Sequence, residues 1–164
     1  MSELVLWNWE KKKRTLLRYI EAGDIFCFQY NTSIYCFGRI LARLDIGTPA
    51  EIFDYISNAP TITEKDIEKT ARMFHPVNLD VYTLFDRRLM GDWRIIGKCR
   101  SFQLESVENA FFTYGVAPYR KIDISGNKFI ITKEEAKNLQ SFGFFNDIHI
   151  KKLIKAKINK DYDN

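Results

Sequence analysis

Few side chains in this chain of 164 residues are suited to catalysis. Nucleophilic catalysis needs a nucleophile beside a base, and the two histidines, His75 and His149, have no serine or cysteine next to them in a known motif. His75 precedes a proline at an expected helix end, and His149 falls on a lysine-rich helix. Both are therefore expected at a helix cap or at the surface. A pairing of Cys99 with a histidine is the alternative, and no motif favours it.

Metal binding and acid–base chemistry also lack a clear pattern. The sequence contains no Cys-x-x-Cys or His-x-x-x-His spacing and no Gly-rich phosphate loop. Asp80, Asp86 and Asp92 flank one expected pair of strands, where two carboxylates could serve as acid and base. Aspartates at strand ends more often serve turns, and no acid–base motif accompanies these three. The residues alone therefore indicate no catalytic group, and neither a cofactor nor a metal site is expected.

A small β-barrel nucleic-acid-binding protein is the alternative function. Tyr82 and Trp93 lie close in sequence to Arg87 and Arg88, and small barrels combine stacking rings with basic side chains in this way. The three aspartates interrupt this segment and would repel phosphate. The net charge of +4 and the isoelectric point of about 8.9 are modest for a dedicated nucleic-acid binder. Nucleic acid is therefore not expected as the main partner.

Charge is unevenly distributed along the chain. Lysines and arginines gather near both ends, whereas the segment from Asp45 to Glu68 holds six carboxylates and one lysine, Lys65, for a net charge of −5. Such a segment is either a docking surface for a basic partner or an ordinary solvated surface. The sequence leaves both interpretations open.

The three cysteines, Cys27, Cys36 and Cys99, indicate a reducing compartment, because their number is odd and no signal peptide precedes them. No stretch approaches the roughly 18 apolar residues of a membrane span, so a cytoplasmic location without membrane contact is expected. A hairpin with Asn31 and Thr32 as its loop would place Cys27 opposite Cys36. Both are expected to be buried apolar side chains that pair only under oxidising conditions.

The elements that would position these residues begin with an alternating β-hairpin over residues 23–44. Its expected register sets Phe26 opposite Phe37 and Phe28 opposite Tyr35, which would gather aromatic rings on one face of a sheet. Further strands are expected at 51–57, 80–87 and 92–98 and in a hairpin over 119–132. Helices are expected at 9–19, 63–74, 133–140 and 147–158.

Two of these helices have a cap that can be read from the sequence. Thr63 and Asp66 form the expected capping pair of the second helix, and Thr132 is the expected cap of the third. Together the elements predict an α+β fold, with a strongly bent antiparallel sheet or a small β-barrel-like core and peripheral helices. The length is that of a single domain over residues 1–164.

Three segments of this core resemble a known family. They are Gly23-Asp24-Ile25-Phe26, the pair Tyr35–Leu41 and Glu51–Tyr55, and Gly91-Asp92-Trp93-Arg94-Ile95-Ile96-Gly97. Their order and spacing are similar to those of the immunity protein 26 family of bacterial polymorphic-toxin systems, over about residues 21–110. The N-terminal basic helix and the C-terminal segment match no pattern of that family.

The resemblance implies a small cytoplasmic antidote of the kind used in contact-dependent growth inhibition. Such proteins are not enzymes. They bind the C-terminal toxin domain of a cognate protein and cover its active site or its substrate surface. Binding of this kind relies on buried aromatic and arginine side chains within a charged rim.

Six residues are therefore candidates for contact with the toxin: Glu51, Asp54, Tyr55, Asp86, Arg87 and Trp93. Glu51 and Asp54 are expected to point outward from the acidic segment. Each candidate also has an ordinary structural explanation. The two carboxylates could be plain surface groups, Tyr55 and Trp93 could be core rings, and Arg87 could serve a local ion pair.

Overall fold

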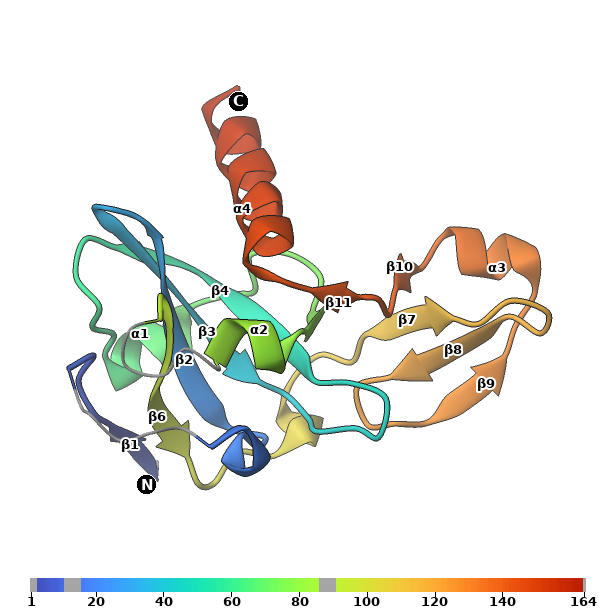
Figure 1. The fold of residues 1–164 in the computed structure, drawn as a ribbon, viewed down its shortest axis with the longest axis horizontal. Coiled ribbons are helices and arrows are strands. Elements are labelled where there is room, and N and C mark those ends of the chain that lie inside the picture. Colours follow the sequence, from blue (N-terminus) through green and yellow to red (C-terminus); the bar gives the residue numbers. More distant parts are fainter. Residues whose placement is uncertain (1–2, 11–15, 86–90, 164) are drawn as a thin grey trace.

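A computed structural model describes residues 3–10, 16–85 and 91–163 (Figure 1). The strands of its larger sheet are β1 (Leu4–Leu6), β2 (Asp24–Asn31), β3 (Ile34–Ile40), β4 (Pro49–Ser57), β5 (Val77–Leu79), β6 (Trp93–Cys99) and β11 (Phe144–Phe145). Those of the smaller sheet are β7 (Phe111–Tyr114), β8 (Arg120–Asp123), β9 (Lys128–Ile130) and β10 (Gln140–Ser141). The helices are η1 (Leu17–Tyr19), α1 (Glu64–Lys69), α2 (Val81–Phe85), η3 (Leu104–Ser106), α3 (Lys133–Lys137) and α4 (Asp147–Tyr162).

The predicted α+β class, with a bent sheet and peripheral helices, is confirmed. The larger sheet has the order β1-β6-β2-β3-β4-β5-β11, and within the described residues it stays open between β1 and β11 and closes no barrel. The smaller sheet has the order β10-β7-β8-β9. Each sheet is mixed, because β11 pairs in parallel with β5 and β10 pairs in parallel with β7. An antiparallel arrangement therefore holds for the central strands but not throughout.

The β2–β3 hairpin forms as predicted, but its register differs by one residue. Cys27 lies opposite Phe37, and Phe28 lies opposite Cys36. The loop falls one residue later than expected, and a bulge at the end of β2 absorbs part of the shift. A one-residue shift exchanges the faces of a strand. Phe26 and Phe28 therefore share a face with Cys36, and the expected pairing of Phe26 with Phe37 is wrong.

The larger sheet separates two hydrophobic cores. The α4-side core contains Phe26 and Cys36 and is covered by side chains of α2 and α4. The α1-side core contains Cys27 and Phe37 and is covered by side chains of β1 and α1. A third core, which includes Phe112, belongs to the smaller sheet. The central strands are apolar on both faces because each face has its own cover.

The segment expected as a strand over 80–87 is a helix as far as it is described. Helix α2 buries Val81, Leu84 and Phe85 and exposes Tyr82, the i, i+3, i+4 spacing of an amphipathic helix. Strand β5 lies just before it, where no strand was expected. Of the expected helix over 9–19, residues 17–19 form η1, and residues 11–15 lie outside the described residues.

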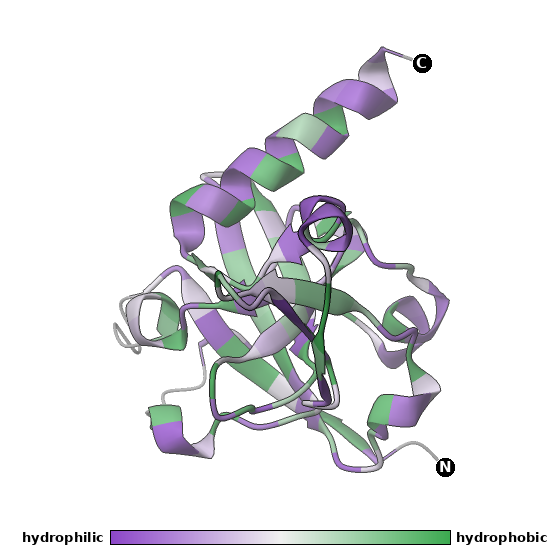
Figure 2. Cartoon of the chain, turned by 90° about the vertical axis from the view of Figure 1, so that its right-hand side faces the viewer, coloured by the Kyte–Doolittle hydropathy of each residue, from purple (hydrophilic) through white to green (hydrophobic). Residues whose placement is uncertain are grey.

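The predicted helix caps are confirmed. Thr63 and Asp66 form a capping box at the start of α1, and the side chain of Thr132 caps α3. Both helices end earlier than expected, whereas α4 continues to Tyr162. The C-terminal end of α4 extends beyond the rest of the described chain, and hydrophilic and hydrophobic residues alternate along it (Figure 2). None of the described helices has the length and apolar character needed to cross a membrane.

Candidate functional site

Glu51, which was expected to point outward, lies buried between two arginines. Only 4% of the residue is exposed. Arg39 donates from Nε to Oε1 at 2.8 Å, and Arg72 donates from Nε to Oε2 at 2.6 Å. Strand alternation explains the burial, because Glu51 shares its face of β4 with Phe53 of the α1-side core. The prediction of an outward carboxylate is therefore wrong at Glu51, which neutralises two cations inside the protein.

Asp54 and Tyr55 lie further along the same strand. Asp54 is exposed, and Tyr55 is half-buried with its ring edge-on to Phe37 at 5.5 Å between centroids. Hydrogen bonds, chiefly from Thr63, lower the pKa of Asp66. Burial, followed by the charge of the Asp66 carboxylate and a hydrogen bond to it, raises the pKa of Tyr55. On this side of the protein, Asp54 and the carboxylates of α1 are in contact with solvent.

Trp93 is a core ring, as one of its two explanations predicted. It is 3% exposed, and its ring stacks on Phe28 with 3.9 Å between centroids and 2° between planes. Its Nε1 donates to Oδ1 of Asp147 at 2.8 Å, which ties β6 to the first turn of α4. The ring is therefore not available to stack on a nucleobase. Asp86 and Arg87 lie outside the described residues.

The two histidines and Cys99 make structural contacts in the described part of the chain. His75 donates from Nδ1 to the carbonyl of Pro76 at 2.8 Å. His149 belongs to the capping box of α4, where its Nδ1 accepts the N–H of Asn146 at 3.2 Å. The Cys99 thiol contacts a serine hydroxyl at 3.7 Å. In the part of the chain that the structure describes, no three His, Cys, Asp or Glu side chains gather closely enough to hold a metal ion.

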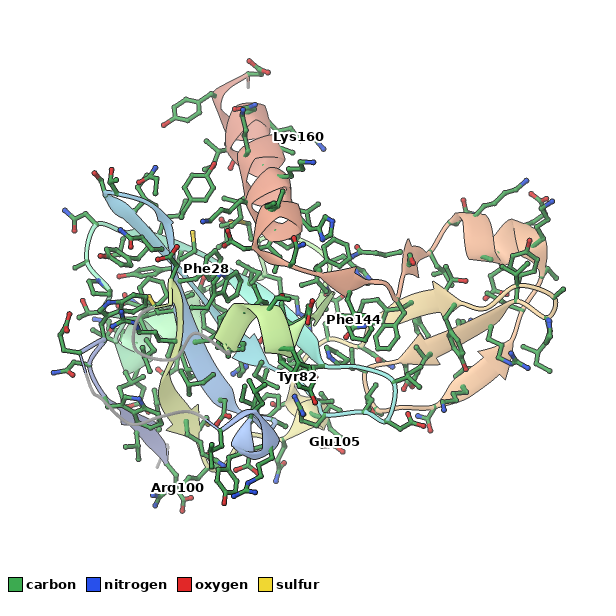
Figure 3. The ribbon with its side chains drawn as sticks, in the orientation of Figure 1. Phe28, Tyr82, Arg100, Glu105, Phe144 and Lys160 are labelled. Atoms are coloured by element: carbon green, nitrogen blue, oxygen red, sulfur yellow. The ribbon has the colours of Figure 1, made fainter. Side chains whose placement is uncertain are left out.

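A groove where the two sheets meet is the strongest surface candidate, and the sequence did not indicate it. It has a volume of about 370 Å³ and lies between the β3–β4 loop, the start of α2 and β11. Tyr82 and Phe144 line it and are 72% and 61% exposed (Figure 3). We call it the junction groove, formed by residues 43–48, 79–82 and Phe144. Large apolar side chains exposed together mark interaction sites on soluble proteins.

A buried asparagine fixes the walls of the junction groove. Asn78 is fully buried; its Oδ1 accepts the N–H of Thr48 at 2.7 Å, and its Nδ2 donates to the carbonyl of Phe142 at 3.0 Å. The Thr48 carbonyl in turn accepts the N–H of Leu79 at 2.9 Å. A Cβ at position 47 would overlap the Asn78 amide, so only Gly47 fits there. Because three segments are tied together, the groove is formed before any partner binds.

Arg43 supplies a cation at the rim of the junction groove. Its Nη1 donates to Oγ1 of Thr48 at 3.2 Å, and no described carboxylate forms an ion pair with it. Asp45, on the same rim, is paired with Lys128 at 3.2 Å, and Asp80 accepts a backbone N–H of α2 at 3.4 Å. The groove therefore combines two aromatic rings, an apolar lining and a guanidinium that no described carboxylate neutralises. Aromatic and arginine side chains are enriched at the energetic centres of protein interfaces.

Sequence reasoning missed the junction groove because its parts are distant along the chain. One signal was present: the spacing of Val81, Leu84 and Phe85 leaves Tyr82 on the outer side of a helix. Assigning that segment to a strand concealed it. Phe144 belongs to a two-residue strand, and no pattern in the sequence distinguishes it from its half-buried neighbour Phe145.

A family model covers the larger part of this structure. The model described as immunity protein 26 matches residues 21–118, from just before β2 to beyond β7, and includes the β3–β4 loop and α2 of the junction groove. The chain belongs to the immunity protein 26 family. The resemblance of the three sequence segments is thereby confirmed.

Membership of the immunity protein 26 family has two general consequences. An immunity protein implies a cognate toxin as its partner, and immunity proteins are generally not enzymes. Phe144, β9 and α4 lie beyond the residues that the immunity protein 26 model matches. No curated protein and no solved structure matches the chain.

Proposed function

We propose that this immunity protein binds a cognate toxin domain and neutralises it by covering the toxin's active site or substrate surface. The family match over residues 21–118 carries the proposal. We place the action in the cytoplasm, in contact-dependent growth inhibition or a related form of bacterial competition. Inhibition by occlusion requires a preformed, complementary surface and no catalytic group of its own.

The junction groove is the proposed anchoring site for the toxin. Burying the rings of Tyr82 and Phe144 would remove a large apolar area from water, and each ring has few rotatable bonds to order. Arg43 would pair with a carboxylate of the toxin, because no described carboxylate of this chain neutralises it. The preferred contact on the toxin is thus an apolar side chain next to an acidic one.

The acidic surface of β4 and α1 is the competing location. Asp54 and Tyr55 stay proposed contacts there, and Glu64 and Glu68 of α1 form no ion pair with described residues. A toxin with a basic substrate surface would be attracted to these carboxylates. Asp86 and Arg87, which follow α2, also stay proposed contacts.

Co-expression tests the function itself. Cells that produce the toxin domain encoded directly upstream should survive when this protein is present and die when it is absent. A toxin domain from an unrelated system should kill in both cases. If the protein neither protects cells from the upstream toxin nor binds that toxin in isothermal titration, the proposed function is falsified.

Alanine variants test which surface of this protein binds the toxin domain. In Tyr82→Ala/Phe144→Ala, two aromatic anchors are lost, so affinity for the upstream toxin domain should fall about a hundredfold or more. Tyr19→Ala/Tyr162→Ala is the matched control, because these rings are 63% and 86% exposed elsewhere on the chain, and its affinity should be unchanged. If Asp54→Lys abolishes binding while the groove variant binds normally, the interface lies on the acidic surface instead.

A further inference from the structure

Strand β9 is an uncovered edge of the smaller sheet. In the part of the chain that the structure describes, β9 pairs with β8 alone, with Phe129 opposite Lys121 at its centre. A strand at the edge of a sheet presents unpaired backbone N–H and C=O groups, which can accept a further strand. The edge lies beyond the residues of the family match, so it is separate from the shared core.

The hydrogen bonds at the two ends of the β8–β9 hairpin show which backbone groups are free. The C=O of residue 127 and the N–H of residue 131 bond to the β8 side, at 3.1 and 3.0 Å. Bonding alternates along an antiparallel pair, so Phe129 also directs its backbone groups toward β8. The N–H and C=O groups of Lys128 and Ile130 therefore point away from the sheet.

The side chains of β9 leave this edge apolar. Phe129 is 46% exposed and Ile130 is 76% exposed. The one charged residue of the strand, Lys128, is engaged by Asp45 at 3.2 Å. Edge strands of soluble proteins commonly carry unpaired charges, a proline or a bulge that prevents further pairing. The sequence of β9 contains no proline, and its pairing with β8 has no bulge.

We propose that β9 pairs antiparallel with β9 of a second copy of this chain, across a two-fold axis beside Phe129. Lys128 of one copy then lies opposite Ile130 of the other, and their outward N–H and C=O groups bond in both directions. Phe129 faces Phe129 of the second copy, with Cβ atoms about 5 Å apart. The two smaller sheets join into one continuous sheet.

The register itself favours a second copy over another strand. An axis at the central residue brings together two residues that both have free backbone groups, and it keeps the two Lys128 side chains apart. It also places two exposed aromatic rings side by side, and such cross-strand pairs stabilise sheets. The contact is small, so association should be weak and should depend on concentration. The inference does not rest on toxin binding.

Sedimentation velocity of the full chain tests the proposal. Measured in a series up to roughly 0.5 mM, the mass should rise reversibly from monomer toward dimer, as mass action requires. A monomer at every concentration overturns the proposal.

Ile130→Pro removes the outward N–H, which β8 does not use, and proline is tolerated at such an edge. Ile130→Val is the matched control, since it keeps both the N–H and a β-branched side chain. The proline variant eliminates half of the intermolecular hydrogen bonds, so dimerisation should weaken about tenfold or more, while the valine variant should dimerise normally. Undiminished dimerisation of a proline variant with wild-type circular dichroism contradicts the proposal.

Charged substitutions at position 129 distinguish a second copy from any other partner. They also avoid the effect of a proline on the backbone. Phe129→Asp and Phe129→Lys each set like charges face to face across the axis, so each variant alone should stay monomeric. An equimolar mixture should associate again, because aspartate then faces lysine. If the mixture associates no better than either variant alone, residue 129 does not face its own copy and the proposal is wrong.

Discussion

Glu51 shows that a charge in an acidic segment can be a structural group rather than a contact for a partner. Its two carboxylate oxygens accept from Arg39 and Arg72, and Arg72 also donates to the carbonyl of Glu108 at 2.6 Å. The network connects β3, β4 and the segments after α1 and η3. The net charge of a segment does not reveal such a group, because burial depends on which face of a strand the residue occupies.

Replacing Glu51 should destabilise the protein strongly. Glu51→Gln removes the negative charge and leaves two arginines close together, so the free energy of unfolding should fall by about 3 kcal/mol. Urea unfolding at pH 7 measures the change. The control Asp54→Asn, at an exposed neighbour, should stay within about 0.5 kcal/mol of wild type. A Glu51→Gln variant as stable as the control would show that the arginines need no counter-charge.

Asp24 should make stability depend on pH. Burial raises the pKa of this carboxyl from its ordinary 3.8 to about 7, and no described cation pairs with it. The folded protein therefore binds a proton more tightly than the unfolded chain between these values, and stability falls as pH rises from about 4 to 7. Above pH 7 this contribution is fully lost.

Asp24→Asn isolates the contribution of this carboxyl. The amide oxygen can still accept the N–H of Glu21, which lies 2.9 Å from Oδ2 in wild type. The stability of the variant relative to wild type should therefore increase from pH 4 to pH 7 and then level off, as measured by urea unfolding at each pH. Parallel curves for the two proteins would exclude a raised pKa at Asp24.

At the scale of elements, the side chain of Asn78 adds to the strand pairing that joins β5 to β4 and to β11. Asn78 lies on β5, and its amide bridges Thr48 of the β3–β4 loop to Phe142, two residues before β11. The caps of α1 and α3 could be predicted from sequence because each lies within a few residues. The Asn78 bridge connects segments that are more distant along the chain, so no local sequence pattern indicates it.

Asn78→Ala should loosen the junction of the two sheets. It leaves a buried N–H at Thr48 and a buried carbonyl at Phe142 without partners, so the free energy of unfolding should fall by about 2–4 kcal/mol. Asn58→Ala, at an exposed asparagine in a loop, is the control and should change stability little. Chemical denaturation compares the two. Equal stability would mean that the groove walls do not depend on the Asn78 hydrogen bonds.

For the whole molecule, much of the secondary structure but little of the candidate site could be predicted from sequence. Alternating apolar residues identified β2, β3 and β6, and capping residues placed the starts of α1 and α3. The predicted register of the β2–β3 hairpin was wrong because the alternation of apolar residues does not reveal a bulge. The junction groove could not be predicted because it exists only when folding brings the β3–β4 loop, α2 and β11 together.

The register of β2 and β3 provides a way to follow unfolding. Cys27 and Cys36 are both fully buried on opposite faces of the sheet, and burial raises the pKa of each thiol. Neither sulfur can react until its own face opens. A thiol-specific reagent would therefore time the opening of the α4-side core at Cys36 and of the α1-side core at Cys27. The protein thus carries one native probe for each of the two cores of its larger sheet.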